Sequence, residues 1–290
     1  MRHGWRWGPD GLRQVVLLAI GVAAAVPIAP APAGAATPSG GAPRAGYWLV
    51  ASDGSVFGSG DAADYGSAGG TPLKQPIVGM AATPTGHGYW LVASDGGIFA
   101  FGDAAFRGST GAIKLNKPIV GMAATPTGGG YWLVASDGGI FAFGDAGFYG
   151  SPSGGRLSQP VVGMASSPTG HGYWLVGADG GVFNYGDAGY FGSKASGRRK
   201  KQIVGIVASR KGSGYSLVAN DGTVVSYGDA AYRNTHVYPQ PIIGMAMTPT
   251  GQGVWLAASD GTVVQQGDAP SYPPHPGGAG SRTIVGIAGL

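Results

Sequence analysis

The sequence predicts an all-β protein: a six-bladed β-propeller of repeats of about 42 residues, closed by its C-terminal strand. Three observations predict this fold. One motif, GYWLVASDGGIFAFGDA, stands at Gly88 and again at Gly130, and it recurs in altered form along the chain. Each recurring segment has the composition of a short β-strand. The chain also ends on a strand-like segment that has no partner in its own repeat.

The repeat period is measured from the tyrosine of the GYWLV segment. This position recurs at a spacing of 42 residues and finally of 39, and it is occupied by Tyr47, Tyr89, Tyr131, Tyr173, Tyr215 and Val254. The shorter spacing follows from a three-residue deletion in a variable loop of the fifth copy, where a surface loop absorbs the change. Six copies of this length are typical of propeller blades.

Three segments of each repeat predict β-strands in the order IVGMA, YWLVAS and GIFAF. They are short, rich in aromatic and β-branched residues, and bounded by Gly, Pro, Asn or Asp. The Asp-Gly pair between the second and third segments predicts a hairpin with a type I′ turn. In the second segment, Trp90 and Val92 point to one face, and Tyr89 and Leu91 to the other. Because both faces are apolar, each blade is expected to pack between two others. We also expect a short, ragged fourth strand at the edge of each blade.

The two ends of the repeat array predict closure. The folded part opens at Gly46 without an IVGM segment before it, and the chain ends with an unpartnered IVGIAGL from Ile284 to Leu290. An open stack would leave two apolar end faces that need caps. We therefore expect the last strand to complete the first blade as its innermost strand, where the small residues of VGMA suit a crowded axis.

The N-terminal segment predicts export. Residues 1–35 have a basic start, an apolar run and a small-residue site at Ala33-Gly34-Ala35, which is the pattern of a signal peptide. Residues 36–45 form a leader rich in Gly, Pro and Ser, and 46–290 form one propeller domain. We expect a secreted protein, free or associated with the cell wall. The alternative is an uncleaved membrane anchor, for which the apolar run is short.

Composition limits the classes of partner. The chain has no cysteine, and its 15 basic and 13 acidic residues after residue 35 give a net charge of +2. This small charge does not indicate a nucleic-acid-binding protein. We also expect the protein to be a monomer. One basic cluster, Arg198 to Lys201 with Arg210 and Lys211 nearby, could touch an anionic surface, but we favour a solvated loop as its explanation.

The repeats GYWLVASDGGIFAFGDA and PIVGMAATPTG resemble those of secreted actinobacterial proteins, in which such arrays stand alone or beside wall-hydrolase and peptidase domains. The resemblance covers Gly46 to Leu290 and implies no particular activity. Two copies depart from the pattern, with Ser216 in place of the tryptophan and Val254 in place of the tyrosine.

Catalytic and metal-binding groups are not apparent. The chain has no glutamate, and twelve of the aspartates after residue 35 fall in two repeated sets at turns, in DG and in GDA. We predict no catalytic residue, no cofactor and no metal; a repeated calcium site is the alternative, although it needs six or more converging oxygens. The G-x-S-x-G motif of α/β-hydrolases is missing.

The positions at which the repeats differ are the candidate ligand-binding residues, since the fold tolerates change there. One ring follows TPTG and contains His87, His171 and Gln252. A second ring follows GDA and contains Arg107, Tyr149, Phe191 and Arg233, whose aromatic members could instead serve packing. The sequence thus predicts a secreted, non-catalytic domain that binds a cell-envelope glycan or an extracellular protein. An esterase-like hydrolase and a structural spacer are the alternatives.

Overall fold

The computed structural model describes residues 44–290 except 153–156, 194–200, 231, 274–279 and 281. The predicted signal peptide, most of the leader and the basic residues 198–200 lie outside the described residues. All regular secondary structure in the described part consists of β-strands. A helix long and apolar enough to cross a membrane is not found there. Eighteen strands form six antiparallel sheets of three strands each.

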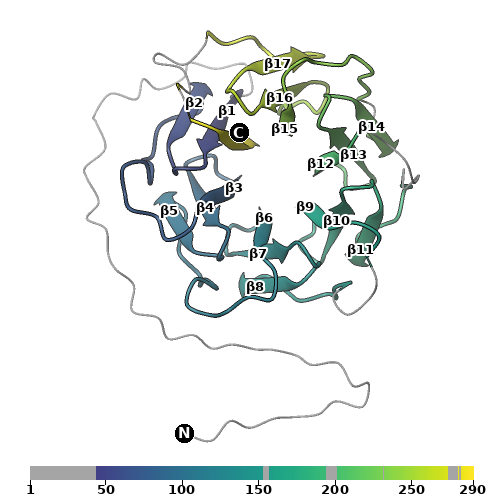
Figure 1. The fold of residues 1–290 in the computed structure, drawn as a ribbon. Helices are drawn as coiled ribbons and strands as arrows, with labels where there is room; N and C mark the ends of the chain where they lie inside the picture. Colours follow the sequence, from purple (N-terminus) through teal and green to yellow (C-terminus); the bar gives the residue numbers. More distant parts are fainter. Residues whose placement is uncertain (1–43, 153–156, 194–200, 231, 274–279, 281) are drawn as a thin grey trace, which may run out of the picture. The chain divides into compact units, whose positions relative to one another are not determined.

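The three strands of each sheet correspond to the three predicted segments (Figure 1). The inner strands are β3 Ile77–Ala82, β6 Ile119–Ala124, β9 Val161–Ser166, β12 Ile203–Ala208, β15 Ile242–Met247 and β18 Ile284–Gly289. The middle strands are β1 Gly46–Ala51, β4 Gly88–Ala93, β7 Gly130–Ala135, β10 Gly172–Gly177, β13 Gly214–Ala219 and β16 Val254–Ala258. The outer strands are β2 Val56–Gly60, β5 Ile98–Gly102, β8 Ile140–Gly144, β11 Val182–Gly186, β14 Val224–Gly228 and β17 Val263–Gln266.

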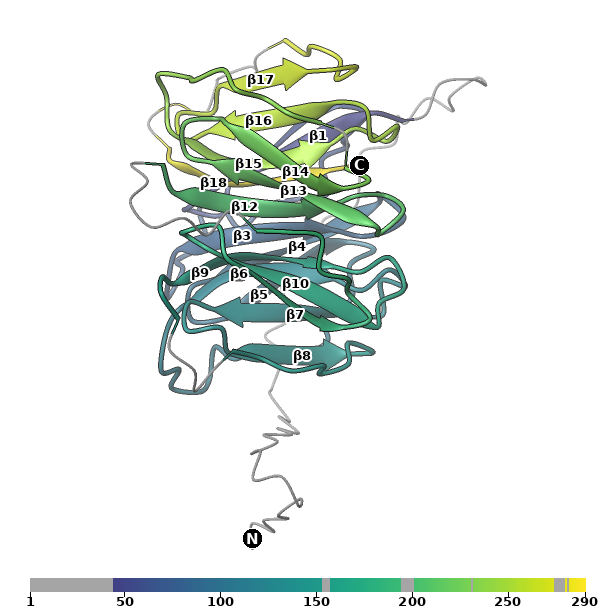
Figure 2. The same ribbon diagram turned by 90° about the vertical axis from the view of Figure 1, so that its right-hand side faces the viewer.

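The six sheets are the blades of a β-propeller, and the expected closure is present. Blade 1 consists of β18, β1 and β2, and blades 2 to 6 follow in chain order. β18 pairs with β1 in antiparallel register, from Tyr47 opposite Gly289 to Ala51 opposite Ile284. The inner strand β18 also contacts the inner strands of blades 2 and 6, so the ring is continuous (Figures 1 and 2). The first and last strands, β1 and β18, thereby lie in one blade.

The core consists of six interfaces between neighbouring blades. Middle strands are fully buried on both faces, as predicted. The tryptophan of one blade packs against the tyrosine of the next, as between Trp90 and Tyr131, whose ring centroids lie 5.6 Å apart. The last blade repeats this contact with the first, since Trp255 and Tyr47 lie 5.4 Å apart. Burial of apolar surface between blades is therefore the main stabilising contribution.

The axis is as crowded as expected. A Cβ on Gly286 of β18 would lie 3.0 Å from the Cγ1 atom of Val50 and 3.5 Å from the Cα atom of Gly79 in the next blade. Glycine at this step lets neighbouring inner strands approach, because a side chain would meet backbone. In blade 2, Val78 precedes the equivalent glycine, Gly79. It has no opposite residue in the pairing of β3 with β4 and so forms a β-bulge.

Two local expectations need correction. The hairpins are not two-residue type I′ turns: Gly54 N–H donates to the Ala51 carbonyl, and Ala51 N–H donates to the Ser55 carbonyl, both over 2.9 Å. This is a three-residue loop in which only Gly54 needs a positive φ, of 84°. The predicted fourth strand is also wrong within the described residues, where one isolated bridge between Val224 and Asn234 is its nearest equivalent.

Candidate functional site

The connections between strands gather on two faces of the ring. We call the first the loop face; it carries the TPTG loops between inner and middle strands and the GDA turns that follow the outer strands. The second, the hairpin face, carries the Asp-Gly hairpins. In blade 2, Asp103 N–H donates to the His87 carbonyl over 3.1 Å, so the TPTG loop and the GDA turn are joined. Both predicted rings of variable residues therefore lie at one end of the blades.

A repeated hydrogen-bond framework supports the loop face. The Thr85 hydroxyl donates to Oδ2 of Asp103 over 2.5 Å. The same threonine accepts from His87 N–H over 3.1 Å. Equivalent threonine–aspartate bonds occur in blades 3, 4 and 6. The GDA aspartates thus serve as acceptors within turns, as predicted.

The hairpin aspartates have a similar structural role. Asp95 Oδ1 accepts from Gly97 N–H over 2.9 Å, and every blade repeats this bond. In the described part of the chain, no group of three or more His, Asp, Glu or Cys side chains converges as a metal site would require. The two aspartate sets are accounted for by turn geometry.

The first ring of predicted residues is exposed. The side chains of His87, His171 and Gln252 stand at the tips of the TPTG loops of blades 2, 4 and 6. His87 Nε2 lies 3.0 Å from Nη1 of Arg44, which precedes the first blade. The structure does not bring His87 and His171 together, because blade 3 stands between their blades.

The second ring divides into two kinds of residue. Arg107 and Arg233 are exposed, whereas Tyr149 and Phe191 are half-buried. Tyr149 packs on Tyr173 of the next blade, with ring centroids 5.8 Å apart. Its hydroxyl also donates to the Gly170 carbonyl over 3.1 Å. For the two aromatic members, this placement agrees with the packing alternative.

The backbone of the second ring is fixed to the neighbouring blade by a buried tyrosine. The Tyr131 hydroxyl accepts from Arg107 N–H over 3.1 Å and donates to the Gly108 carbonyl over 2.6 Å. Tyr89, Tyr173 and Tyr215 make the same pair of bonds. Burial raises the pKa of Tyr131 to about 12, so this hydroxyl stays protonated near neutral pH.

Three functional candidates were missed by the sequence analysis. Phe106, Phe148 and Tyr190 occupy one equivalent position, directly before the second ring, and are 52%, 54% and 57% exposed. In each case the residue that follows donates its N–H to the tyrosine of the next blade. The signal was present as an adjacent pair of bulky residues, FR, FY and YF, of which only one can turn inward.

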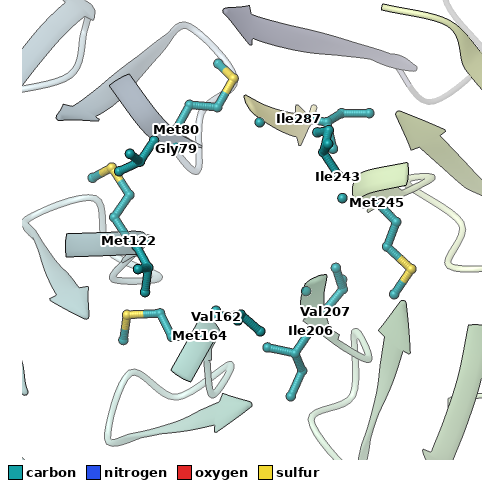
Figure 3. A pocket seen from close by; sticks show the side chains of 17 residues that line it. Gly79, Met80, Met122, Val162, Met164, Ile206, Val207, Ile243, Met245 and Ile287 are labelled. Atoms are coloured by element: carbon teal, nitrogen blue, oxygen red, sulfur yellow. The ribbon is translucent and has the colours of Figure 1, made fainter. Parts of the chain in front are cut away.

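The central channel offers a different kind of space. It has a volume of about 120 Å³ and is lined by the Val-Gly-Met steps of the inner strands, such as Val78, Gly79 and Met80. Figure 3 shows its labelled lining residues, all of them apolar, around an open centre. Among the described residues, no side chain that lines the channel is charged or carries a hydrogen-bonding group.

A hydrolytic site would need a histidine beside an activated hydroxyl. In blade 4, His171 and Asp187 both lie near the Thr169 hydroxyl. Burial would raise the pKa of Asp187, but hydrogen bonds from Thr169 and Ser167 and the charge of His171 hold it below its ordinary value. The carboxylate, and not the imidazole, thus stands beside the hydroxyls, and the same arrangement of hydroxyl and carboxylate recurs in other blades as part of the turn.

Comparison with known proteins supports the fold. No family model matches the chain, and no curated protein matches it. Among solved structures, the chain is similar to the β-propeller domain of Cps50 (Swd1) from Myceliophteria thermophila, at 11% identity and a TM-score of 0.52, over 78% of this chain and 84% of that one. The chain is a β-propeller.

Proposed function

We propose that this protein is a secreted, non-catalytic binding domain that recognises an extracellular ligand, a cell-envelope glycan or a protein, through its loop face. One observation carries the proposal: the loop face combines a repeated framework with side chains that differ from blade to blade. The threonine–aspartate bonds hold the loops in place, while His87, His171 and Gln252 at their tips are exposed. A fixed scaffold with variable tips is the arrangement expected of a recognition surface.

A paired-variant capture experiment tests this proposal. Immobilised protein is incubated with cell-envelope extract, and bound material is compared with that retained by a loop-face variant carrying His87→Ala, His171→Ala and Gln252→Ala. The control carries Lys117→Ala and Gln240→Ala, two exposed residues that precede inner strands on the hairpin face. We expect only the loop-face variant to lose bound material. Equal retention by both variants would contradict the proposal.

Export is part of the proposal and has its own test. Expression in an actinobacterial host, followed by N-terminal sequencing of protein from the medium and the wall fraction, should give a chain that starts near Ala36. Protein that keeps residues 1–35 and stays in the membrane fraction would support the anchor alternative.

The hydrolase alternative is tested by turnover. The protein is screened against ester, glycoside and peptide substrates, and any activity is measured again after His171→Ala and Asp187→Asn. Turnover that one of these substitutions abolishes would replace the binding proposal with an enzymatic one. We expect no such turnover.

A further inference from the structure

Three exposed aromatic rings lie at the rim of the loop face in blades 2, 3 and 4. Phe106, Phe148 and Tyr190 each stand three residues after the GDA aspartate and next to a residue whose backbone is bound to the following blade. The rings are therefore presented from an ordered backbone at one equivalent site in three consecutive blades. Single exposed apolar residues are common on protein surfaces, but these three share one equivalent position in consecutive blades and so form a regular series.

Packing does not require an aromatic residue at this position in blades 2 to 4. The interior of these blades already holds a tryptophan, whose indole N–H is bonded to the carbonyl just before the exposed ring, as from Trp90 to Ala105 over 2.9 Å. Blade 5 is the contrast, because Ser216 replaces the tryptophan and the equivalent Tyr232 packs into the interface with blade 6. In blade 5, where the tryptophan is missing, the aromatic residue at this position packs inward. In blades 2 to 4, where the tryptophan is present, it is exposed to solvent.

Cationic side chains continue the rim in blade 5. Arg210 and Lys211 replace the Pro-Thr of the TPTG loop, and Arg233 occupies the second ring; all three are exposed. The ion pairs found within the described residues, Lys201–Asp221 and Arg282–Asp53, are on the hairpin face. Arg210, Lys211 and Arg233 form no ion pair with any described residue, and they outnumber the single carboxylate of the GDA turn in blade 5. Blade 5 thus carries local positive charge directly after the aromatic series.

We propose that blades 2 to 5 form one binding track for a linear acidic polysaccharide with uronate residues in its chain. Pyranose rings at intervals along the polymer pack their apolar faces on Phe106, Phe148 and Tyr190, and carboxylates bind Arg210, Lys211 and Arg233. The assignment rests on the proposed function of the loop face and specifies its ligand.

The distribution of the rings favours a polymer over a protein. A protein interface needs a contiguous, desolvated apolar centre. Here the rings stand one per blade, separated by polar residues such as Asp103 and Arg107, and each offers the same surface. A chain of repeated sugar units matches a repeated site. A polyol phosphate polymer would satisfy the cations but has no ring face for the aromatic residues.

Titration calorimetry with defined polymers tests the track. The probes are a polyuronate oligosaccharide, its neutral methyl ester, polyglutamate as an anionic chain without sugar rings, and a polyglycerol phosphate. The aromatic variant carries Phe106→Ala, Phe148→Ala and Tyr190→Ala. The cation variant carries Arg210→Gln, Lys211→Gln and Arg233→Gln. The matched control carries Ile113→Ala and Val237→Ala, which remove exposed apolar side chains elsewhere, 38% and 55% exposed.

We expect the polyuronate to bind best. The aromatic variant should weaken binding of the polyuronate and of its ester about tenfold or more, equivalent to ~1.4 kcal/mol. The cation variant should weaken the polyuronate alone and reduce its dependence on salt. The control should bind like the parent, and all variants should keep the parent's melting temperature because the altered side chains are exposed.

Three results would overturn the track: no binding of polyuronate by the parent protein, equal binding of polyglutamate or polyglycerol phosphate, or an equal loss in the control variant. Failure of this assignment is distinguishable from failure of the proposed function. If envelope extract still yields a ligand that the loop-face variant loses, the binding face stands and the polysaccharide class is wrong.

Discussion

Removal of Ile284 to Leu290 should unfold the propeller. The five residue pairs between β18 and β1, at about 1 kcal/mol for each backbone hydrogen bond, contribute roughly 5 kcal/mol. Ile284 is fully buried, and its side chain adds about 2 kcal/mol. A loss of roughly 7 kcal/mol falls within the ~5–15 kcal/mol of total stability typical of a domain. The exposed edge of β1 would also invite aggregation.

The assay compares melting temperature and solution mass by light scattering for the parent, the truncated chain and two point variants. Ile284→Val should cost about 1 kcal/mol and Ile284→Ala about 2–5 kcal/mol, so that the series reports packing before the strand is lost. An open array of repeats would lose only its frayed last unit, because each unit contacts its neighbours alone. A truncated chain that stays monomeric and melts within a few degrees of the parent would therefore refute closure.

Three further predictions concern the blade interfaces, with urea unfolding as the measurement. Tyr131→Phe removes a buried hydroxyl that makes two hydrogen bonds and should cost about 1–3 kcal/mol of stability. Tyr232→Phe removes a buried hydroxyl that has no hydrogen-bond partner within the described residues and should be neutral or stabilising. Equal losses of stability in the two variants would contradict the stabilising role of the Tyr131 hydrogen bonds. Burial raises the pKa of Tyr131 and Tyr173 from 10.0 to about 12. The unfolded chain therefore loses these protons first, and stability should fall between about pH 10 and 12, more gently in the Tyr131→Phe variant. Ser216→Trp alone should overpack the interface and cost about 1–3 kcal/mol, with much of the loss recovered by adding Tyr232→Ala; strict additivity would show that the two side chains do not share space.

The architecture could be predicted because the same pattern of strands and turns recurs in six copies. The period, the apolar character of both faces of YWLV and the unpartnered IVGIAGL together left a closed ring as the arrangement that buries every face. Details that depend on backbone geometry were not accessible. The Asp-Gly pair has the same letters in a two-residue and a three-residue hairpin, and only the hydrogen bond from Ala51 N–H to the Ser55 carbonyl separates them.

The candidate site was harder to predict because variation between repeats has two causes. In the sequence, Ser216 and Val254 are two departures from the repeat in different copies. Each tryptophan faces the tyrosine of the next blade, so these residues occupy opposite sides of one interface. Loss of both partners, together with inward packing of Tyr232, is a compensated change that serves the fold.

The cations of blade 5 differ from this pattern in a way that bears on function. Arg210 stands where the other loops have proline, and its stem still lies over Gly251 of the next blade, as Pro84 lies over Gly128. The packing role is thus kept by the aliphatic part, while the added guanidinium reaches solvent without an ion pair among the described residues. Packing between blades does not account for that charge. In a repeat protein, a departure that a facing residue compensates indicates a structural requirement, whereas one that adds an unpaired group above an unchanged contact has no such explanation and is the kind of residue on which the proposed track depends.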